Sequence, residues 1–162
     1  MRRLELALLL LVAVLAVTVL LVRRGAGPPP SPYCRRGSPL AGVYHPARLH
    51  VLRRCAVATG VVTKVKFEEF DGDVHVDLRT DDGGRLVVEV IPQDRAVVPI
   101  PDTGARVTVV GPRVWDTAHD WGEIHPAWWI SSGRIVPAST QELARVESLL
   151  RDDQGKQEVS NG

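Results

Sequence analysis

The amino-acid sequence predicts a mainly β protein in which a small barrel follows a single apolar N-terminal helix. Apolar and polar residues alternate in several short segments between residues 55 and 130, as in half-buried strands. Gly60 interrupts the first segment, which indicates a bulge or a sharp bend. A stretch with three prolines, residues 92–104, separates the third segment from the fourth. These features favour a five-stranded OB-like Greek-key barrel over residues 43–137.

The first 24 residues are predicted to form a signal anchor, that is, a single N-terminal transmembrane helix. Residues 4–22 are apolar at all but two positions, and at about 1.5 Å per residue such a helix just crosses a hydrocarbon core of about 30 Å. Arg2 and Arg3 precede this run, and no ordinary cleavage site follows it directly. We therefore expect a single-pass protein of the cell membrane with its domain outside the cytoplasm. Cleavage, which would release a secreted domain, is the alternative.

Residues 25–42 are rich in proline and glycine and predict an extended linker between the membrane and the barrel. The only two cysteines, Cys34 and Cys55, lie in this linker and at the start of the first strand. Outside the cytoplasm the two can form a disulfide, and closing a loop of this size typically stabilises a fold by about 3 kcal/mol. The sequence leaves two free thiols open as the alternative.

The expected strands are residues 55–67, 74–80, 85–91, 106–116 and 123–130. A three-residue loop at 82–84, with glycine available for the left-handed position, predicts the register of the second hairpin. Leu78 then lies opposite Val88, because a slip of one residue would bury a carboxylate. The same register places Asp77 directly across from Glu89 on the outer face, where like charges repel unless a positive group intervenes.

After the barrel, residues 138–162 are expected to form a short helix and a disordered tail. Ser139 and Glu142 have the spacing of a capping box, in which each side chain bonds the backbone N–H of the other residue. Apolar residues at helical spacing between 143 and 150 predict a short amphipathic helix. Residues 151–162 are polar and are expected to be disordered.

The charge balance bears on the class of partner. Residues 43–137 contain 11 Lys and Arg against 13 Asp and Glu, a net charge of −2. A module that binds nucleic acid usually carries a basic patch or stripe, so the composition argues against a nucleic-acid partner.

Tryptophans and polar residues gather around the octapeptide His119-Asp-Trp-Gly-Glu-Ile-His-Pro126. Because tryptophan can stack on sugar rings, nucleobases or peptides, this segment is the predicted ligand-binding site. Its candidate residues are Trp115, Trp121, Trp128, Glu123 and His125. The alternative is structural: the tryptophans close one end of the barrel, with at least one of Trp128 and Trp129 in the core.

Imidazoles and carboxylates of the same strands suit a divalent metal such as zinc. The candidate metal ligands are His75, Asp77, Glu89, His119 and His125. Their spacing matches no established metal signature, and the alternative is that His75 and Arg79 simply neutralise the carboxylates. Hydrolysis by paired acids or by a histidine base is conceivable, but no serine or cysteine nucleophile pattern supports an enzyme.

Three stretches together resemble a known group of proteins: Val57-Ala-Thr-Gly-Val-Val-Thr-Lys-Val65, Asp73-Val-His-Val-Asp77 and the octapeptide. They are similar to bacterial membrane-anchored or secreted OB-like domains with a His-x-Trp-x-Glu-Ile-His-Pro signature near the end of the barrel. The likeness covers residues 54–130. Asp120 and Gly122 stand where the group typically has Gly and Asn, so the loop conformation is expected to differ. The resemblance implies the barrel fold and the importance of His75, Asp77, Glu123 and His125, and it implies no reaction.

The sequence as a whole favours a membrane-anchored extracytoplasmic binding or interaction module of a bacterial envelope. Its partners would be the membrane, through the N-terminal helix, and an envelope ligand or protein that the sequence does not identify. This hypothesis needs no cofactor. Two alternatives stay open: a metal-binding domain with or without hydrolytic activity, and a binder of single-stranded nucleic acid, which the fold suggests and the charge balance argues against.

Overall fold

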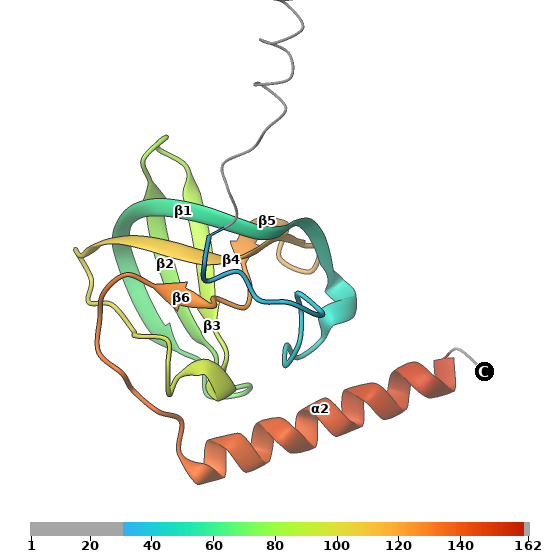
Figure 1. Cartoon of the computed structure of the whole chain (residues 1–162). Helices are drawn as coiled ribbons and strands as arrows, with labels where there is room; N and C mark the ends of the chain where they lie inside the picture. Colours follow the sequence, from blue (N-terminus) through green and yellow to red (C-terminus); the bar gives the residue numbers. More distant parts are fainter. Residues whose placement is uncertain (1–30, 161–162) are drawn as a thin grey trace, which may run out of the picture. The chain divides into compact units, whose positions relative to one another are not determined.

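Five strands close into a ring around one apolar core. The computed structural model describes residues 31–160, and its strands are β1 (Leu49–Phe67), β2 (Val74–Thr80), β3 (Arg85–Val90), β4 (Arg106–Asp116) and β5 (Trp121–Ile124). Their order is β1-β2-β3-β5-β4, and β1 pairs with β4 to close the ring (Figure 1). All neighbours are antiparallel except β3 and β5, which are parallel. The predicted mainly β, barrel-like fold is confirmed.

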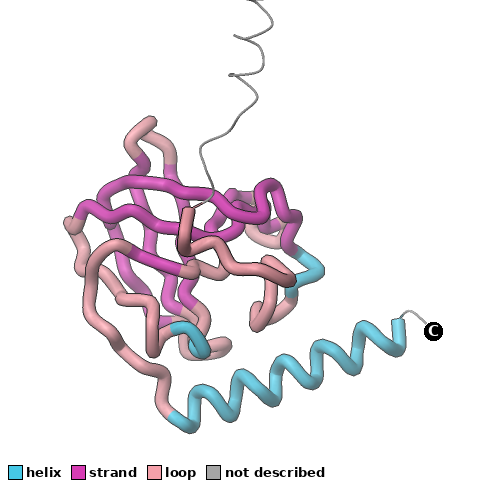
Figure 2. The backbone as a smooth tube through the Cα atoms, in the orientation of Figure 1, coloured by secondary structure: helices cyan, strands magenta, loops and turns pink. Residues whose placement is uncertain are grey.

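The interior of the ring is filled by side chains that alternate along the strands, as a half-buried sheet requires. The buried cluster includes Val62, Val76, Leu78, Val88, Val109 and Ile124, with Val98 and Ile100 from the connection between β3 and β4. That connection, 91–105, contains one short 3-10 helix, η2 (Pro92–Asp94), and Figure 2 shows it running outside the strands as a loop. The proline-rich stretch thus forms a long crossover, as the sequence predicts.

Strand β1 is longer than predicted, because residues 49–54 extend it toward the N-terminus after a second 3-10 helix, η1 (Pro46–Arg48). The first part of β1 pairs with β4 and the last part with β2. Gly60 lies where both neighbours are paired, and a Cβ there would be 2.6 Å from the carbonyl oxygen of Arg79. The bulge in the pairing with β2 lies between Val62 and Lys64. Gly60 is therefore needed for close approach of β2, and the bend follows it.

The predicted register of the β2–β3 hairpin is wrong by two residues. Val76 pairs with Val88 and Leu78 with Leu86, because a loop longer than three residues closes the hairpin. The Thr80 hydroxyl donates to the Asp82 carboxylate at the start of this loop. A shift of two keeps every side chain on its face, so the apolar pattern cannot distinguish the two registers. The shift separates Asp77 from Glu89, and His75 faces Glu89 instead.

The predicted fifth strand, 123–130, is two strands. After β5 the chain leaves the ladder at the cis peptide bond between His125 and Pro126, and β6 (Trp129–Ile130) pairs with β4 farther along. Pro126 has no N–H with which to continue a ladder. The segment between the strands stays tied to its neighbours, since the Ala127 N–H donates to the carbonyl of Glu89.

Residues 31–42, assigned from sequence to an extended linker, pack against the barrel. Cys34 and Cys55 form a disulfide with a Cα–Cα distance of 5.8 Å, one of the two states that the sequence leaves open. Tyr33 stacks on Trp129, with 4.2 Å between the ring centroids. Arg35 Nη1 donates to both oxygens of the Asp94 carboxylate in η2. The described part of the predicted linker is therefore a strap on the barrel.

The C-terminal helix α2 (Thr140–Ser160) continues ten residues beyond Leu150, so the prediction of a disordered tail from residue 151 is wrong for residues 151–160. The capping box is confirmed: the Ser139 N–H donates to the Glu142 carboxylate, and the Glu142 N–H donates to the Ser139 hydroxyl. In Figure 1, α2 runs past one end of the barrel. Val146 is buried there, which fixes the first half of the helix.

The predicted signal anchor, residues 1–24, lies outside the described residues. Within residues 31–160, no helix combines the length and the apolar character that crossing a membrane requires.

Candidate functional site

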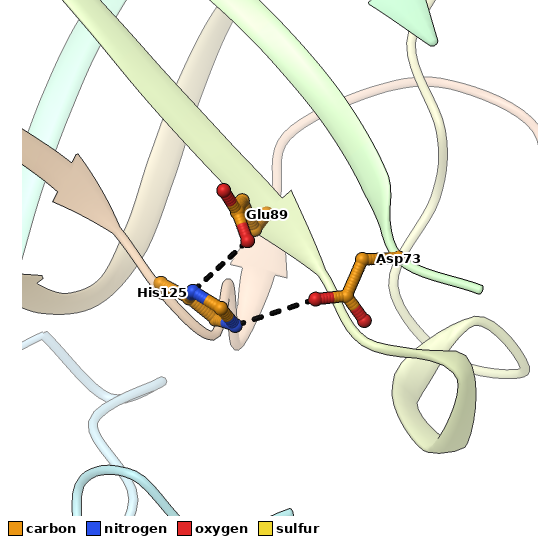
Figure 3. A group of neighbouring side chains, drawn as sticks. All are labelled: Asp73, Glu89 and His125. Carbon is orange, nitrogen blue, oxygen red and sulfur yellow. Dashed lines mark ion pairs between the residues drawn. The ribbon is translucent and has the colours of Figure 1, made fainter. Parts of the chain in front are cut away.

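Four buried ionisable side chains meet at one end of the barrel, and we call them the buried ionic cluster: Asp73, Glu89, Glu123 and His125. Asp73 directly precedes β2, Glu89 is near the end of β3, Glu123 belongs to β5, and His125 follows β5. Figure 3 shows the Glu89 and Asp73 carboxylates on either side of the His125 ring. Because β3 and β5 are parallel neighbours, their C-terminal ends bring these chemically active groups together.

His125 is the centre of the buried ionic cluster. Its Nδ1 lies 2.9 Å from a Glu89 oxygen and 3.4 Å from a Glu123 oxygen, and its Nε2 lies 3.4 Å from an Asp73 oxygen. The Glu89, Glu123 and His125 side chains are at most 1% exposed. Three carboxylates therefore surround one imidazole out of contact with water.

Burial and charge shift the pKa values of the buried ionic cluster in different directions. Burial raises the pKa of Asp73 to about 6, although His125 opposes this shift. Burial also disfavours ionised Glu89, but the positive charges of His125, His75 and Arg48 outweigh it and bring the pKa of Glu89 to about 2. For His125 burial lowers the pKa, and the surrounding carboxylates overcome it, so the pKa lies well above its ordinary value.

The close contacts in the buried ionic cluster are poorly directed. Neither ring nitrogen of His125 has a hydrogen-bond partner among the described residues, and the same holds for one oxygen of Glu89 and one of Glu123. Buried polar atoms are nearly always satisfied by an aligned partner, an ordered water or an ion. These atoms thus attract one another by charge without forming aligned hydrogen bonds.

The sequence candidates His75 and Asp77 separate in the structure. His75 borders the buried ionic cluster, with its Nε2 3.2 Å from the second Glu89 oxygen and its Nδ1 3.6 Å from Glu68. Asp77 is paired with Arg85 at 2.9 Å on the outer face. The predicted repulsion between Asp77 and Glu89 does not arise, and Asp77 is not a member of the cluster.

His119 belongs to a separate group in the loop between β4 and β5. Its Nδ1 is 2.8 Å from the buried carboxylate of Asp116, which also contacts Arg48 at 3.3 Å. The other Asp116 oxygen accepts the N–H groups of Ala118 and His119. Asp116 is thereby fully engaged in holding the loop.

The four tryptophans differ in exposure and role. Trp121 is half-buried: His119 stacks on its indole at 4.7 Å, the Arg85 guanidinium lies 4.8 Å from its centroid, and its N–H donates to Glu123. Trp128 is buried and therefore offers no surface to a ligand. Trp129 stacks on Tyr33. Trp115 is 39% exposed. The expectation that at least one of Trp128 and Trp129 is core is confirmed.

A cavity of about 370 Å³ opens between β1, the β2–β3 hairpin, β4 and β5, and we call it the cationic cavity. Arg53, Arg85 and Arg113 line it together with one carboxylate, Asp82, and its wall includes the apolar side chains of Val57, Ala58, Leu86 and Ile124. Arg85 is paired with Asp77, so Arg53 and Arg113 against Asp82 leave the positive excess. The overall charge of −2 in the domain conceals this local arrangement.

One arginine of the cationic cavity, Arg113, is only partly engaged. Arg113 has a buried Nη1 without a hydrogen-bond partner among the described residues. Burial lowers the pKa of Arg113, and the charges of Glu123 and Asp82 oppose that shift. Asp82 itself accepts from the Thr80 hydroxyl and the Gly84 N–H. Arg113 therefore keeps donor capacity that no described residue uses.

A second cavity of about 190 Å³ shares Arg85 with the first. Its other positive groups include Lys64 and Lys66, and Trp121 lines its wall. In this smaller cavity Lys66 pairs with Glu68, and Arg85, which lines both cavities, pairs with Asp77. The cationic cavity is the better candidate for binding.

The chain matches no protein-family model, and no curated protein is significantly similar to it.

Sequence reasoning found Glu89, Glu123 and His125 but missed Asp73 and the three arginines. Asp73 sits in an acidic turn and resembles an ordinary solvated loop residue. Arg53, Arg85 and Arg113 lie on three different strands, 28 or more positions apart in sequence. The outward position of Arg85 in the period-two pattern could have marked it as a candidate binding residue. That the three arginines line one cavity depends on closure of the strand ring, which the sequence pattern does not show.

Proposed function

We propose that this chain is a membrane-anchored, extracytoplasmic binding module of a bacterial envelope, an OB-like barrel that holds an anionic ligand in the cationic cavity. The single observation that carries the ligand class is the gathering of Arg53, Arg85 and Arg113 around a cavity of about 370 Å³. Ligand sites in proteins typically have volumes of about 300–1,000 Å³. The membrane anchor and the likeness to the His-x-Trp-x-Glu-Ile-His-Pro group are parts of the same proposal.

The topology supports an OB-like barrel. A bent first strand, a ring order of β1-β2-β3-β5-β4 and a long crossover before β4 agree with a partly open five-stranded Greek-key barrel. Such barrels bind oligomeric ligands along the face of strands 2 and 3. The hairpin residues that line the cationic cavity come from β2, β3 and the loop between them.

The disulfide supports a site outside the cytoplasm. Disulfides form and persist in oxidising compartments and are rare in the reducing cytosol. Cys34 and Cys55 join the strap to β1. For an extracytoplasmic domain that is anchored to the membrane, the nearest available ligands are the glycans, lipids and phosphorylated polymers of the envelope.

The chemistry of the cationic cavity selects phosphate or carboxylate. A guanidinium group presents a rigid fork of donors that matches these anions two oxygens at a time. The apolar side of the cavity, Val57 and Leu86 among others, would accept a carbon skeleton. Both features together fit a phosphorylated or carboxylated sugar better than a bare ion.

The test is isothermal titration calorimetry of the purified full chain in detergent micelles, with pyrophosphate and with a hexose phosphate as the ligands. Arg113→Gln should weaken binding by about 10-fold or more, because a hydrogen bond to a charged group contributes about 1.5–3 kcal/mol. Arg134→Gln is the matched control, since Arg134 is exposed and does not line the cavity. Equal affinity in wild type and Arg113→Gln, or no binding of either probe at millimolar concentration, contradicts the proposal.

Single-stranded nucleic acid is an outcome of the same experiment. A short oligonucleotide that bound more tightly than the hexose phosphate, with affinity falling steeply as salt rises, would indicate a nucleic-acid binder.

A further inference from the structure

We propose that Asp73, Glu89 and His125 form a binding site for one divalent transition-metal ion such as Zn²⁺. The site lies at the end of the barrel where β3 and β5 finish, and its lining residues differ from those of the cationic cavity. The inference therefore does not depend on the anionic ligand.

The first argument is the donor set. Each of the three residues offers one ligand atom, and these atoms all lie within 4.8 Å of one another. Zinc binds imidazole nitrogen and carboxylate oxygen at about 2.0–2.2 Å, so two ligands of a tetrahedral ion lie roughly 3.3–3.6 Å apart. The distance of 3.4 Å between His125 Nε2 and the Asp73 oxygen falls in this range. One imidazole with two carboxylates suits Zn²⁺ or Mn²⁺.

The second argument is the direction of the contacts. The ring nitrogens of His125 lie within 2.9–3.4 Å of carboxylate oxygens, yet neither makes an aligned hydrogen bond with a described residue. An oxygen of Glu89 is also buried without a hydrogen-bond partner. Buried nitrogen and oxygen atoms whose hydrogen bonding the described residues leave incomplete are usually satisfied by an ordered water or an ion.

The third argument is the balance of charge. Asp73, Glu89 and Glu123 bring three carboxylates to one imidazole in a site closed to water. An isolated buried charge is costly unless it is paired or coordinates a metal. A divalent cation would balance the excess.

Glu123 would then orient His125 without binding the ion. Histidine ligands usually direct their second ring nitrogen at a carboxylate, which fixes the orientation of the ring. Glu123 lies 3.4 Å from His125 Nδ1 and is itself held by the indole N–H of Trp121. Trp121 thus has a place in the site as a support.

The other group of possible ligands, Asp116, His119 and Glu123, is the weaker candidate. Asp116 already binds Arg48, His119 and two backbone N–H groups. His119 is largely exposed and stacks on Trp121.

The first test is the metal content of the full chain, purified in detergent without chelator and measured by inductively coupled plasma mass spectrometry. We expect about one zinc or manganese ion per wild-type chain, and at least a 10-fold loss in Asp73→Asn and in His125→Gln. His50→Gln is the matched control, because His50 is exposed on β1 and lies outside the cluster. Wild-type protein without a stoichiometric ion, even after incubation with excess Zn²⁺, overturns the inference.

The second test measures thermal unfolding of the wild type after chelation and after re-addition of Zn²⁺. A bound ion stabilises the folded state, so Zn²⁺ should raise the unfolding temperature by about 5 °C or more in wild type and leave Asp73→Asn unchanged. Asp73→Asn keeps the size of the side chain, and circular dichroism checks that it folds. An ion that persists in Asp73→Asn but is lost in His119→Gln would place the metal at the other group and overturn the assignment. The wild-type response decides the question if neither variant folds.

Discussion

Two residues of the octapeptide that depart from the expected signature have clear structural roles. Asp120 has a φ of 59°, a left-handed conformation that glycine adopts freely and that aspartate tolerates better than most residues. Its N–H donates to the Asp116 carbonyl, which closes the turn. Gly122 leaves room for the Arg113 guanidinium, since a Cβ there would lie 2.6 Å from Nη2 of Arg113. Gly122 thus affects the position of Arg113, one of the arginines that line the cationic cavity.

Gly122→Ala should weaken pyrophosphate binding by about 5-fold or more while changing the unfolding temperature little. The added methyl group collides with the far end of a flexible side chain, so Arg113 can move out of its position without disturbing the backbone. Calorimetric titration and thermal unfolding of the same preparation separate the two effects. An unchanged affinity would show that the guanidinium position at Gly122 is not the one used for binding.

At the scale of single elements, helix α2 is attached through its first turns. The Glu142 carboxylate accepts from Ser139 and also from Arg95, whose side chain is nearly buried beside η2. Arg95 further donates to the Val136 carbonyl and lies over the Phe67 ring. One cap therefore joins the start of the helix to the barrel.

This cap should make helix attachment depend on pH. Hydrogen bonds from Ser139 and then Arg95 lower the pKa of Glu142 to about 2. A carboxyl whose folded pKa is depressed contributes stability above its unfolded pKa of about 4.5, and the contribution is lost as pH falls toward 2. Wild type should thus unfold at a higher temperature than Glu142→Gln at pH 7, and the difference should shrink between pH 4.5 and pH 2. A difference that is constant over that interval would mean that the charge of Glu142 has no part in the cap.

At the scale of the whole described domain, the strap of residues 31–42 packs against the outside of the barrel. The disulfide fixes it to β1, the Arg54 guanidinium donates to the Gly37 carbonyl, and Leu40 and Val43 pack with Leu49, Ile91 and Val114. The five apolar residues of this group form a second apolar cluster, on the outside of the ring. The strap covers strand surface that would otherwise meet water.

Removing the disulfide should lower the free energy of unfolding by about 3 kcal/mol, because the bond closes a loop with a sequence separation of 21. The measurement is denaturant unfolding of the wild type and of the Cys34→Ser/Cys55→Ser double variant. Reductant should shift the wild-type midpoint to that of the variant and leave the variant unaffected. Equal midpoints with and without reductant would show that the strap is held by its other contacts alone.

The sequence by itself determined the local features of this protein. The period-two patterns located β2, β3 and β4 within one residue, Ser139 and Glu142 marked the start of α2, and the octapeptide pointed to Glu123 and His125. Each of these features depends on neighbours in the chain, whose spacing in a strand or helix is fixed by backbone geometry. Glu89 was selected for its place on a strand, although the partner predicted for it was wrong.

Only the tertiary structure decided the register, the split of the last strand and the membership of both sites. A two-residue shift leaves the apolar pattern unchanged, so the turn at Thr80–Gly84 settled which residue faces Glu89. Asp73 joins His125, and Arg53 joins Arg113, through contacts between segments more than 50 positions apart in sequence. Such contacts form when the ring closes, because strand pairing and burial bring distant segments together at one end of the barrel. No local pattern records which polar side chains will meet there.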